Sequence, residues 1–319
     1  DALGAERPRV DLQVLPNAVP FVLSSLRHRL DYPMLVVAPK PEEARRLYEQ
    51  LTVWSGPDIE VLHFPETETL PFERVISDDD TIHQRLRTLS RLNLGDSPVL
   101  IVASVAALVQ STVDHEAFES SCHTLTAGQE IEPESLLDQW QRIGYRFEAN
   151  VDAPGLASRR GGIIDVFPPD AEAPARIELW GNEIESIRLF DPATQRSSSQ
   201  VKSLTVIPCQ ETLPGLVSNA DLGEIARSID LSGCNAATQQ RISDELGLIL
   251  EGQLVEDLNF YAGLFNYGSL LDYLPSGSLL AMHRSSDIAE AGLGIDERTR
   301  QLRETKQRRG ELPAGFPSS

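Results

Sequence analysis

The chain has 319 residues, more than one hydrophobic core usually organises, so its length predicts two or three domains. Hydrophobic residues make up 41% and charged residues 24%, ordinary globular values that exclude a disordered or collagen-like chain. The net charge is −20, and acidic residues are in excess in each of the segments 1–122, 123–210 and 211–319. Binding of nucleic acid by its phosphates requires a basic surface, so nucleic acid is a poor direct partner unless folding gathers distant basic residues on one face.

Cysteine spacing and hydropathy predict a cytoplasmic protein with no membrane partner. Cys122, Cys209 and Cys234 are odd in number and far apart, which is typical of a reducing compartment. No apolar run approaches the roughly 18 to 20 residues of a membrane-spanning helix. The charged start differs from a signal peptide. Because the first residue is not Met and the end, GELPAGFPSS, resembles a linker, we also expect a fragment of a longer protein.

The first 122 residues have the pattern of an α/β domain. Residues 34–38 (MLVVA) and 99–103 (VLIVA) are short continuous apolar runs, which are typical of strands buried on both faces of a parallel sheet. Each run precedes a predicted helix, one beginning near Pro41 and one near Val105. A further helix is expected behind the acidic run 78–80. Two strand–helix units predict a doubly wound sheet.

The pattern changes from helical to strand-like within the segment 123–210. A short helix is predicted over residues 135–144 and ends at a glycine. Strands rich in β-branched and aromatic residues are predicted at 163–167, 176–180 and 183–190. Gly181 and Asn182 fit a two-residue hairpin turn. We therefore expect the segment 123–210 to be an inserted α+β domain with a small antiparallel sheet.

Residues 211–319 form a mainly helical segment by their pattern. The exceptions are a strand-like run at 279–282 and a charged helix predicted over about 296–309. If 123–210 is an insertion, the chain must return to the first domain after it. We therefore expect 211–319 to complete that domain.

A nucleotide-binding α/β domain requires a glycine-rich turn and a lysine after its first strand, because glycine lets consecutive N–H groups surround a phosphate. The candidate turn is Pro16 to Pro20, between a strand expected to end at Val14-Leu15 and a helix expected over 21–30. It contains no glycine and no lysine, and its two prolines remove two N–H donors. The turn therefore indicates a loop that caps a helix, with no bound cofactor.

Metal-binding and catalytic patterns are equally sparse. The six histidines never occur as HxH or HxxxH, and no cysteine has a second one nearby in sequence. No GxSxG motif is present, although a Ser/His/Asp triad is recognisable only in three dimensions. We expect no metal site and no catalytic residue.

The most unusual stretch is APGLASRRGGIIDVFPP, residues 153–169. Gly161 and Gly162 permit a tight turn, which would hold Arg159 and Arg160 at the lip of a sheet. Arginine beside an aromatic residue is the composition of a protein-binding hot spot. The alternative is that the arginines are simply solvated and that Phe167 lies in the domain core.

Longer motifs resemble one known family. GYRFEANVDAPGLASRRGGIIDVFPP followed by RIELWGNEIESIRLFDPATQRS, residues 144–197, closely resembles the excinuclease-B homology module of bacterial transcription-repair coupling factors. Residues 64–92 and 99–110 match the same module in the same order. The resemblance is clear over about residues 10–210 and weaker over 211–319, where RRGELPAGFP fits the end of the module.

The resemblance implies a degenerate RecA-like, P-loop-type parallel-sheet domain (1–122, completed by 211–319) that carries an inserted domain (123–210) for binding the excinuclease A protein. Two departures distinguish the chain from the excinuclease B protein, which has an intact phosphate loop and a tyrosine-rich insertion that holds damaged DNA. Here the phosphate loop is replaced by residues 16–20, and residues 64–81 contain no tyrosine. The implied chain is not an enzyme by itself, although its full-length parent would be an ATP-dependent DNA translocase.

By the same resemblance, Arg146, Arg160 and Phe167 fall on expected contact positions for excinuclease A, and Arg159 is a neighbour with less support. RNA polymerase and DNA would be contacted only through other domains of the parent. A C-terminal domain of the parent is expected to mask the docking face. The alternative function is a fragment of an ATP-dependent DNA-remodelling enzyme like excinuclease B.

Overall fold

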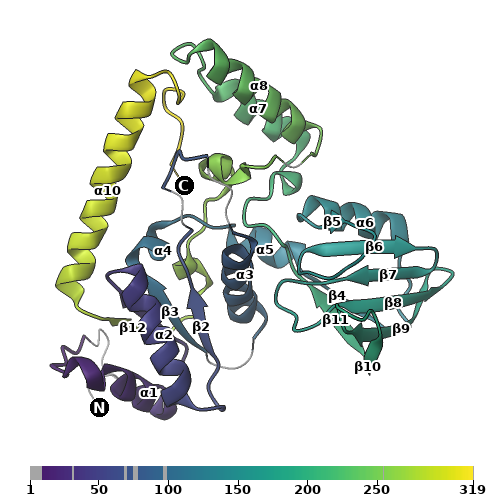
Figure 1. The fold of residues 1–319 in the computed structure, drawn as a ribbon, viewed down its shortest axis with the longest axis horizontal. Coiled ribbons are helices and arrows are strands. Elements are labelled where there is room, and N and C mark those ends of the chain that lie inside the picture. Colours follow the sequence, from purple (N-terminus) through teal and green to yellow (C-terminus); the bar gives the residue numbers. More distant parts are fainter. Residues whose placement is uncertain are drawn as a thin grey trace.

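The structure, a computed structural model, describes residues 9–30, 32–67, 70–74, 78–95, 99–253 and 255–318. The described strands form a four-stranded, a six-stranded and a two-stranded sheet, with helices between and around them (Figure 1). The expected α/β class with a parallel sheet is therefore confirmed. The finer RecA-like assignment and the domain limits stay predictions.

The first part of the chain forms a parallel sheet between helices. Its elements are α1 (Val19–Arg29), β1 (Met34–Ala38), α2 (Pro41–Ser55), β2 (Val61–Phe64), α3 (Asp79–Leu94), β3 (Leu100–Ser104), α4 (Val105–Val109) and α5 (His115–Ser121). The strand order is β12-β1-β3-β2, and every pairing in it is parallel. We call this sheet and its helices the scaffold.

Both faces of the scaffold sheet are covered, as its continuous apolar runs predict. Met34 and Val36 pack with residues of α1 and α2, whereas Leu35 and Val37 pack with residues of α3. All five residues of β1 and of β3 are buried. Strands buried on both faces read as uninterrupted apolar sequence, because neither set of alternating side chains meets water.

The prediction of a strand ending at Val14-Leu15 is wrong. Described residues 9–15 form no strand, and a 3-10 turn over Pro16–Ala18 leads directly into α1 at Val19. Alternating apolar residues alone do not make a strand, because the backbone also needs a hydrogen-bonded neighbour.

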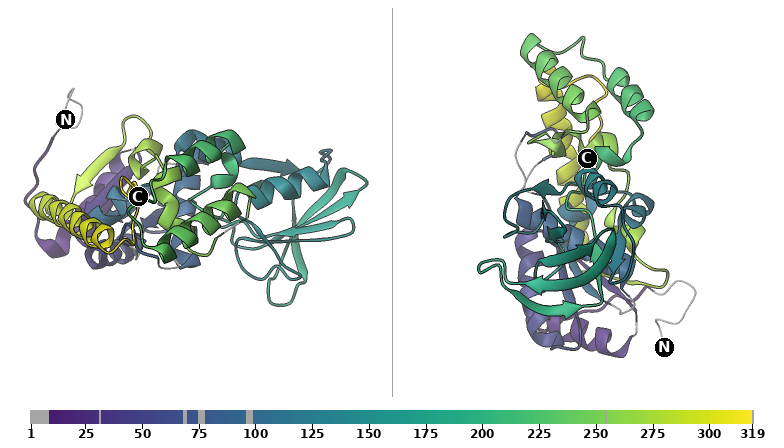
Figure 2. Two further views of the ribbon diagram at one scale, coloured as in Figure 1. Left: turned by 90° about the horizontal axis from the view of Figure 1, so that it is seen from above. Right: turned by 90° about the vertical axis from the view of Figure 1, so that its right-hand side faces the viewer.

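The segment 123–210 forms the second sheet, with one helix lying on it (Figures 1 and 2). Its elements are β4 (His123–Thr126), α6 (Pro133–Arg142), β5 (Arg146–Phe147), β6 (Leu156–Arg160), β7 (Ile163–Val166), β8 (Ala175–Trp180), β9 (Glu183–Phe190), β10 (Ser197–Val201) and β11 (Ser203–Val206). The six-stranded sheet has the order β10-β9-β8-β7-β6-β5, and only the β5–β6 pairing is parallel. β4 pairs with β11, so the two ends of the segment lie side by side.

The predicted hairpin between β8 and β9 is confirmed. Gly181 has a φ of +63°, the left-handed conformation that glycine adopts without strain. Trp180 pairs with Glu183 directly across the turn. The helix predicted over 135–144 begins two residues earlier, at Pro133, because Glu132 caps it by accepting from the N–H groups of Glu134 and Ser135.

The last part of the chain contains the predicted strand and more helix than its pattern indicates. Its elements are α7 (Asn219–Ser228), α8 (Ala236–Leu250), α9 (Ala262–Phe265), β12 (Leu279–Met282) and α10 (Ser285–Arg308), with 3-10 turns at Pro214–Leu216, Leu258–Tyr261 and Leu270–Tyr273. β12 pairs with β1, so this segment adds a strand to the scaffold sheet. α10 begins at Ser285 and not near 296, because Ile288, Ala291 and Ile295 pack against the core. Among the helices of the described ranges, none combines the length and apolar character needed to span a membrane.

Candidate functional site

The glycine pair at 161–162 makes the hairpin turn between β6 and β7. Gly161 has a φ of +61°, as a tight turn requires. Arg160 pairs with Ile163 directly before the turn, and Arg159 pairs with Ile164 one step further back. Successive side chains of a strand point to opposite faces, so the two arginines do not share a surface.

Arg159 lies on the face of the sheet that α6 covers. Its Nη1 donates to Oε1 of Glu134, in the first turn of α6, at 2.5 Å. Its strand partner Ile164 is fully buried. Both arginines lie at the end of β6 directly before the turn, as expected, but on opposite faces of the sheet, and Arg159 joins the sheet to its own helix.

Arg160 lies on the opposite face, which no helix of the described residues covers and which we call the open face (Figure 2). A row of paired residues crosses it from β6 to β9, and the row consists of Ser158, Asp165, Arg176 and Arg188. The next row along the strands consists of Arg160, Ile163, Glu178 and Ser186. The open face is therefore largely charged, in contrast to the isoleucine-rich face beneath α6.

Asp165 and Arg176 form the centre of the open face. The Asp165 side chain is only 1% exposed, and its two oxygens accept from Nε and Nη2 of Arg176, each at 2.8 Å. These hydrogen bonds raise the pKa of the Arg176 guanidinium. The guanidinium also lies 4.8 Å from the centre of the Phe190 ring. Bidentate pairing and ring stacking hold Arg176 in one position.

Arg160 is held by its neighbours but is weakly neutralised. Its Nη2 donates to the carbonyl oxygen of Ala149 at 3.0 Å and lies 3.7 Å from Oδ2 of Asp165. That carboxylate already binds Arg176 through both oxygens. The Arg160 side chain is 55% exposed, so it presents a positive charge to solvent on an acidic protein.

Glu178 and Arg188 form a second polar group on this face. Ser186 donates to Oε2 of Glu178 at 2.6 Å, and Nη2 of Arg188 lies 3.6 Å from the same oxygen. Sequence reasoning did not single out Asp165, Arg176, Glu178 or Arg188. The available signal was the alternation of charged and apolar residues in RIELW and EIESIRLF, which is typical of a strand with one free face.

Arg146 lies away from Arg160, at the junction with the scaffold. It pairs with Leu156, four residues before Arg160 on β6, or about 13 Å along the strand. Its Nη2 donates to Oδ2 of Asp79, the first residue of α3, at 3.1 Å, and both side chains are half exposed. Such an exposed pair contributes little to stability, about 0 to 1 kcal/mol.

Phe167 is a buried residue of the inserted segment. It is 7% exposed and packs in a small cluster with Val151, Leu156 and Phe190. The backbone N–H of Phe167 bonds to the Leu156 carbonyl, so the ring stands on the same side of the sheet as Asp165 but beneath the loop that carries Val151. Of the two alternatives, the structure places Phe167 in the core, and its role as a contact residue for excinuclease A stays a prediction.

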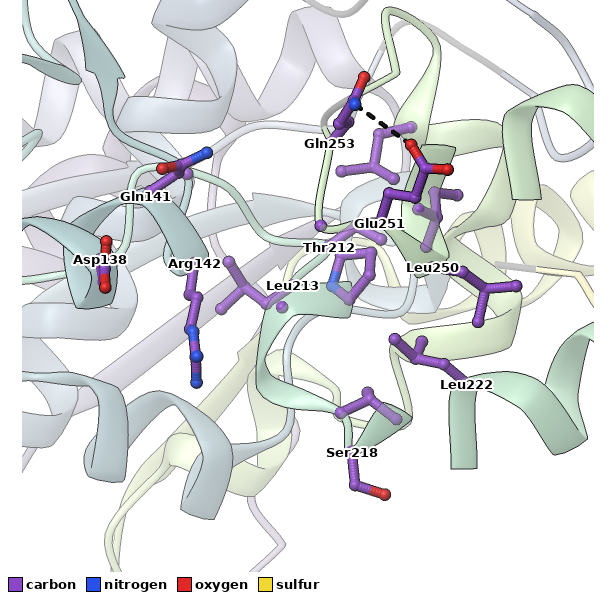
Figure 3. A pocket seen from close by; sticks show the side chains of 17 residues that line it. Asp138, Gln141, Arg142, Thr212, Leu213, Ser218, Leu222, Leu250, Glu251 and Gln253 are labelled. Carbon is purple, nitrogen blue, oxygen red and sulfur yellow. Dashed lines mark hydrogen bonds between the residues drawn. The ribbon is translucent and has the colours of Figure 1, made fainter. Parts of the chain in front are cut away.

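A groove of about 560 Å³ is lined by α6 on one side and by α7, the end of α8 and the loop after it on the other. Figure 3 shows Asp138, Gln141 and Arg142 of α6 on one side and Leu222 and Leu250 on the other. The hydrogen bond drawn in it joins Gln253 to Glu251 at 3.3 Å, within one loop. The groove belongs to the junction between the inserted sheet and the helices α7 and α8.

These features define an α/β scaffold that carries an inserted segment with one open, charged sheet face. The family model described as UvrB interaction domain matches residues 124–211, nearly the whole of the inserted segment. The similarity to known proteins extends beyond the inserted segment into the scaffold.

The chain is 31% identical to the transcription-repair-coupling factor of Bacillus subtilis over 281 residues, which cover 84% of this chain and 23% of the relative. It is 33% identical to that of Myxococcus xanthus over 211 residues, 64% of this chain and 18% of the relative. The UvrABC system protein B of Yersinia pestis is 26% identical over 309 residues, 86% of this chain and 45% of that protein.

The chain belongs to the family of the transcription-repair-coupling factors over the part of their length that it matches. The resemblance inferred from the sequence motifs is thus confirmed. The chain spans about a quarter or less of these relatives, and it spans less than half of the UvrABC system proteins B that it resembles.

Proposed function

We propose that this chain is the recruitment module of a transcription-coupled DNA repair factor, and that it binds excinuclease A through the open face. The observation that carries the proposal is the under-neutralised guanidinium of Arg160 on a sheet face that none of the helices in the described ranges covers. The match of residues 124–211 to the UvrB interaction domain supports it independently.

The arrangement of charges suits protein recognition. Asp165 and Arg176 are fixed in a bidentate pair, so the surface that a partner meets is organised before binding. Arg160 then has donors left to pair with a carboxylate of the partner. Arg188 and Glu178 extend the polar surface toward β9, and such charges determine which partners are accepted.

We further propose that the chain has no ATPase activity of its own. Residues 9–15 form no strand, and residues 16–20, which make the turn and the start of α1, contain two prolines but no glycine or lysine. A phosphate site at that helix start would lack the N–H groups that the prolines remove. This combination supports a scaffold role for the parallel sheet.

In the longer parent, RNA polymerase and DNA would be contacted by other domains, one of which would act as an ATP-dependent DNA translocase. A C-terminal domain of the parent would cover the open face until the motor engages. Recruitment of excinuclease A would then depend on the state of the motor. The isolated chain would bind constitutively.

Titration of purified excinuclease A against this chain tests the proposal. We expect binding without nucleotide, and we expect Arg160→Glu to weaken it by about 2 kcal/mol or more because the charge of a buried contact is reversed. Arg298→Glu on α10, the same charge change on the far side of the molecule, is the matched control.

Two results would contradict the proposal. Equal binding of the Arg160→Glu variant and the wild type would remove the open face as the docking site. Saturable ATP binding by the isolated chain would favour the alternative, a fragment of an ATP-dependent DNA-remodelling enzyme. Titration with labelled ATP and with duplex DNA at moderate salt separates the two functions.

A further inference from the structure

Trp180 is the most exposed tryptophan of the described residues. It is the last residue of β8, directly before the turn at Gly181, and it is 79% exposed. The other two tryptophans have packing partners: Trp140 is fully buried, and the ring centre of Trp54 lies 5.5 Å from that of Phe21. No ring or cation contact of this kind is found for Trp180 within the described ranges.

Trp180 belongs to the open face by strand alternation. Arg176, Glu178 and Trp180 are alternate residues of β8, so their side chains point to the same side of the sheet. The backbone N–H of Leu179 bonds to the carbonyl of Gly162 at 2.7 Å, which brings the end of β8 beside the β6–β7 turn. Both hairpin turns therefore lie at the same end of the sheet, the end far from the scaffold (Figure 1).

Ile163 connects this indole to the charged part of the face. It pairs with Arg160 on one side and with Glu178 on the other, and it is 38% exposed. Arg160, Ile163 and Trp180 thus form a short diagonal of cation, aliphatic and aromatic groups, which we call the distal patch. Tryptophan and arginine are among the residue types most enriched in binding hot spots.

Folding does not explain the position of Trp180. An indole buries about 150 to 250 Å² when it is covered, but at 79% exposure it contributes little of that to the fold. At an interface the same area would be removed from water together with Ile163, next to the guanidinium of Arg160. A partner that matches the patch must offer an apolar pocket with a carboxylate beside it.

We propose that Trp180 is the apolar anchor of the open face, and that it enters a pocket of the bound protein whose rim carries a carboxylate for Arg160. This inference rests on the proposed function and names the partner chemistry that the face selects. Charge complementarity supports an acidic rim, because Asp165 already binds Arg176 through both oxygens and leaves Arg160 under-neutralised.

The test compares Trp180→Ala with Trp54→Ala in titrations of excinuclease A. Trp54 lies on α2 of the scaffold and is 53% exposed, so it controls for loss of a surface indole. We expect Trp180→Ala to weaken the Kd at least about thirtyfold, the change that a hot-spot residue produces. Trp54→Ala should leave it unchanged, and both variants should keep their native circular dichroism.

The outcomes separate this inference from the proposed function. If Arg160→Glu weakens binding and Trp180→Ala does not, the anchor is wrong and the recruitment function stands. If the wild type does not bind excinuclease A, both fail. If sedimentation shows a dimer of the wild type that Trp180→Ala abolishes, the patch binds a second copy of the chain, and the assignment to a repair partner is overturned.

Discussion

The two larger sheets of this molecule differ in how many of their faces are covered. In the scaffold sheet, adjacent residues Met34 and Leu35 are both buried, one against α1 and α2 and the other against α3. In the six-stranded sheet, the adjacent residues Ile163 and Ile164 are 38% and 0% exposed. The central strands of the first sheet are covered on both faces, whereas the second sheet has one uncovered face.

This difference determines which sheet has side chains free for recognition. A sheet with helices on both faces has few side chains left for recognition, so its role is to position what is attached to it. An antiparallel sheet with one helix layer keeps a second, polar face that partners can reach. The proposed function follows the open face and not the larger parallel sheet.

The largest predicted effect concerns the ion pair that joins the two regions. Arg85 of α3 donates to Glu211 at 2.8 Å, where the chain leaves the inserted segment, and Thr112 donates to the other Glu211 oxygen. Arg85→Met leaves the buried carboxylate without its cation, so we expect a loss of about 3–5 kcal/mol in the free energy of unfolding. Chemical denaturation measures it.

The exposed pair of Arg300 and Glu297 on α10 provides the control for this prediction. Arg300→Met should cost at most about 1 kcal/mol, because both partners stay solvated. The double variant Arg85→Met with Glu211→Gln should recover part of the loss, since it removes the unpaired charge. If Arg85→Met and Arg300→Met lowered the free energy of unfolding equally, the pair of Arg85 and Glu211 would not be the buried contact that joins the two regions.

A second prediction uses neighbouring residues as internal controls. Met34→Ala, Leu35→Ala and Ile164→Ala each remove a buried side chain, so each should cost about 2–5 kcal/mol. Ile163→Ala on the open face should cost less than about 1 kcal/mol. Denaturation curves of the four variants check this, and a large loss for Ile163→Ala would mean that the face is not open.

The smallest effect is a pH dependence that arises in the covered part of the inserted segment. Burial lowers the pKa of His123, whose Nε2 accepts a hydrogen bond from the indole of Trp140 at 2.9 Å. His123 therefore binds a proton more readily in the unfolded chain than in the folded protein. The stability that neutral His123 contributes is present above its unfolded pKa of about 6.5 and is lost as the pH falls through its pKa in the folded protein.

Unfolding free energies at pH 7.5 and 5.5 test this sign. The wild type should be less stable at pH 5.5, and burial lowers the pKa of His63 and His83 in the same direction. His123→Gln should reduce the pH dependence, because an amide can still accept from the indole but does not titrate there. An unchanged slope would show that His123 does not contribute.

Much of the scaffold was predictable because its signals are local. The runs at 34–38 and 99–103 are strands, and the helix after Pro41 buries the Ala44, Leu47 and Leu51 face. The strand expected at Val14-Leu15 does not form, since a pattern of apolar residues does not reveal whether a neighbouring strand is available. The same difficulty applies to the candidate site.

At the candidate site, sequence reasoning identified Arg160 but not its surroundings. Alternation along β6 could have separated Arg159 from Arg160, because that rule is local. Burial of Phe167 depends on Val151 and Phe190, which other segments bring to it. Arg176 and Arg188 join the site only through the pairing of β7, β8 and β9.

Sequence alone determined where strands are buried on both faces and where glycine permits a hairpin. These properties depend on the periodicity of side chains and on backbone angles within a few residues. Tertiary structure decided that Asp165 neutralises Arg176 and leaves Arg160 exposed, and that Glu211 meets Arg85 across 126 positions. Such pairings depend on strand register and domain packing, which bring together residues that no local pattern connects.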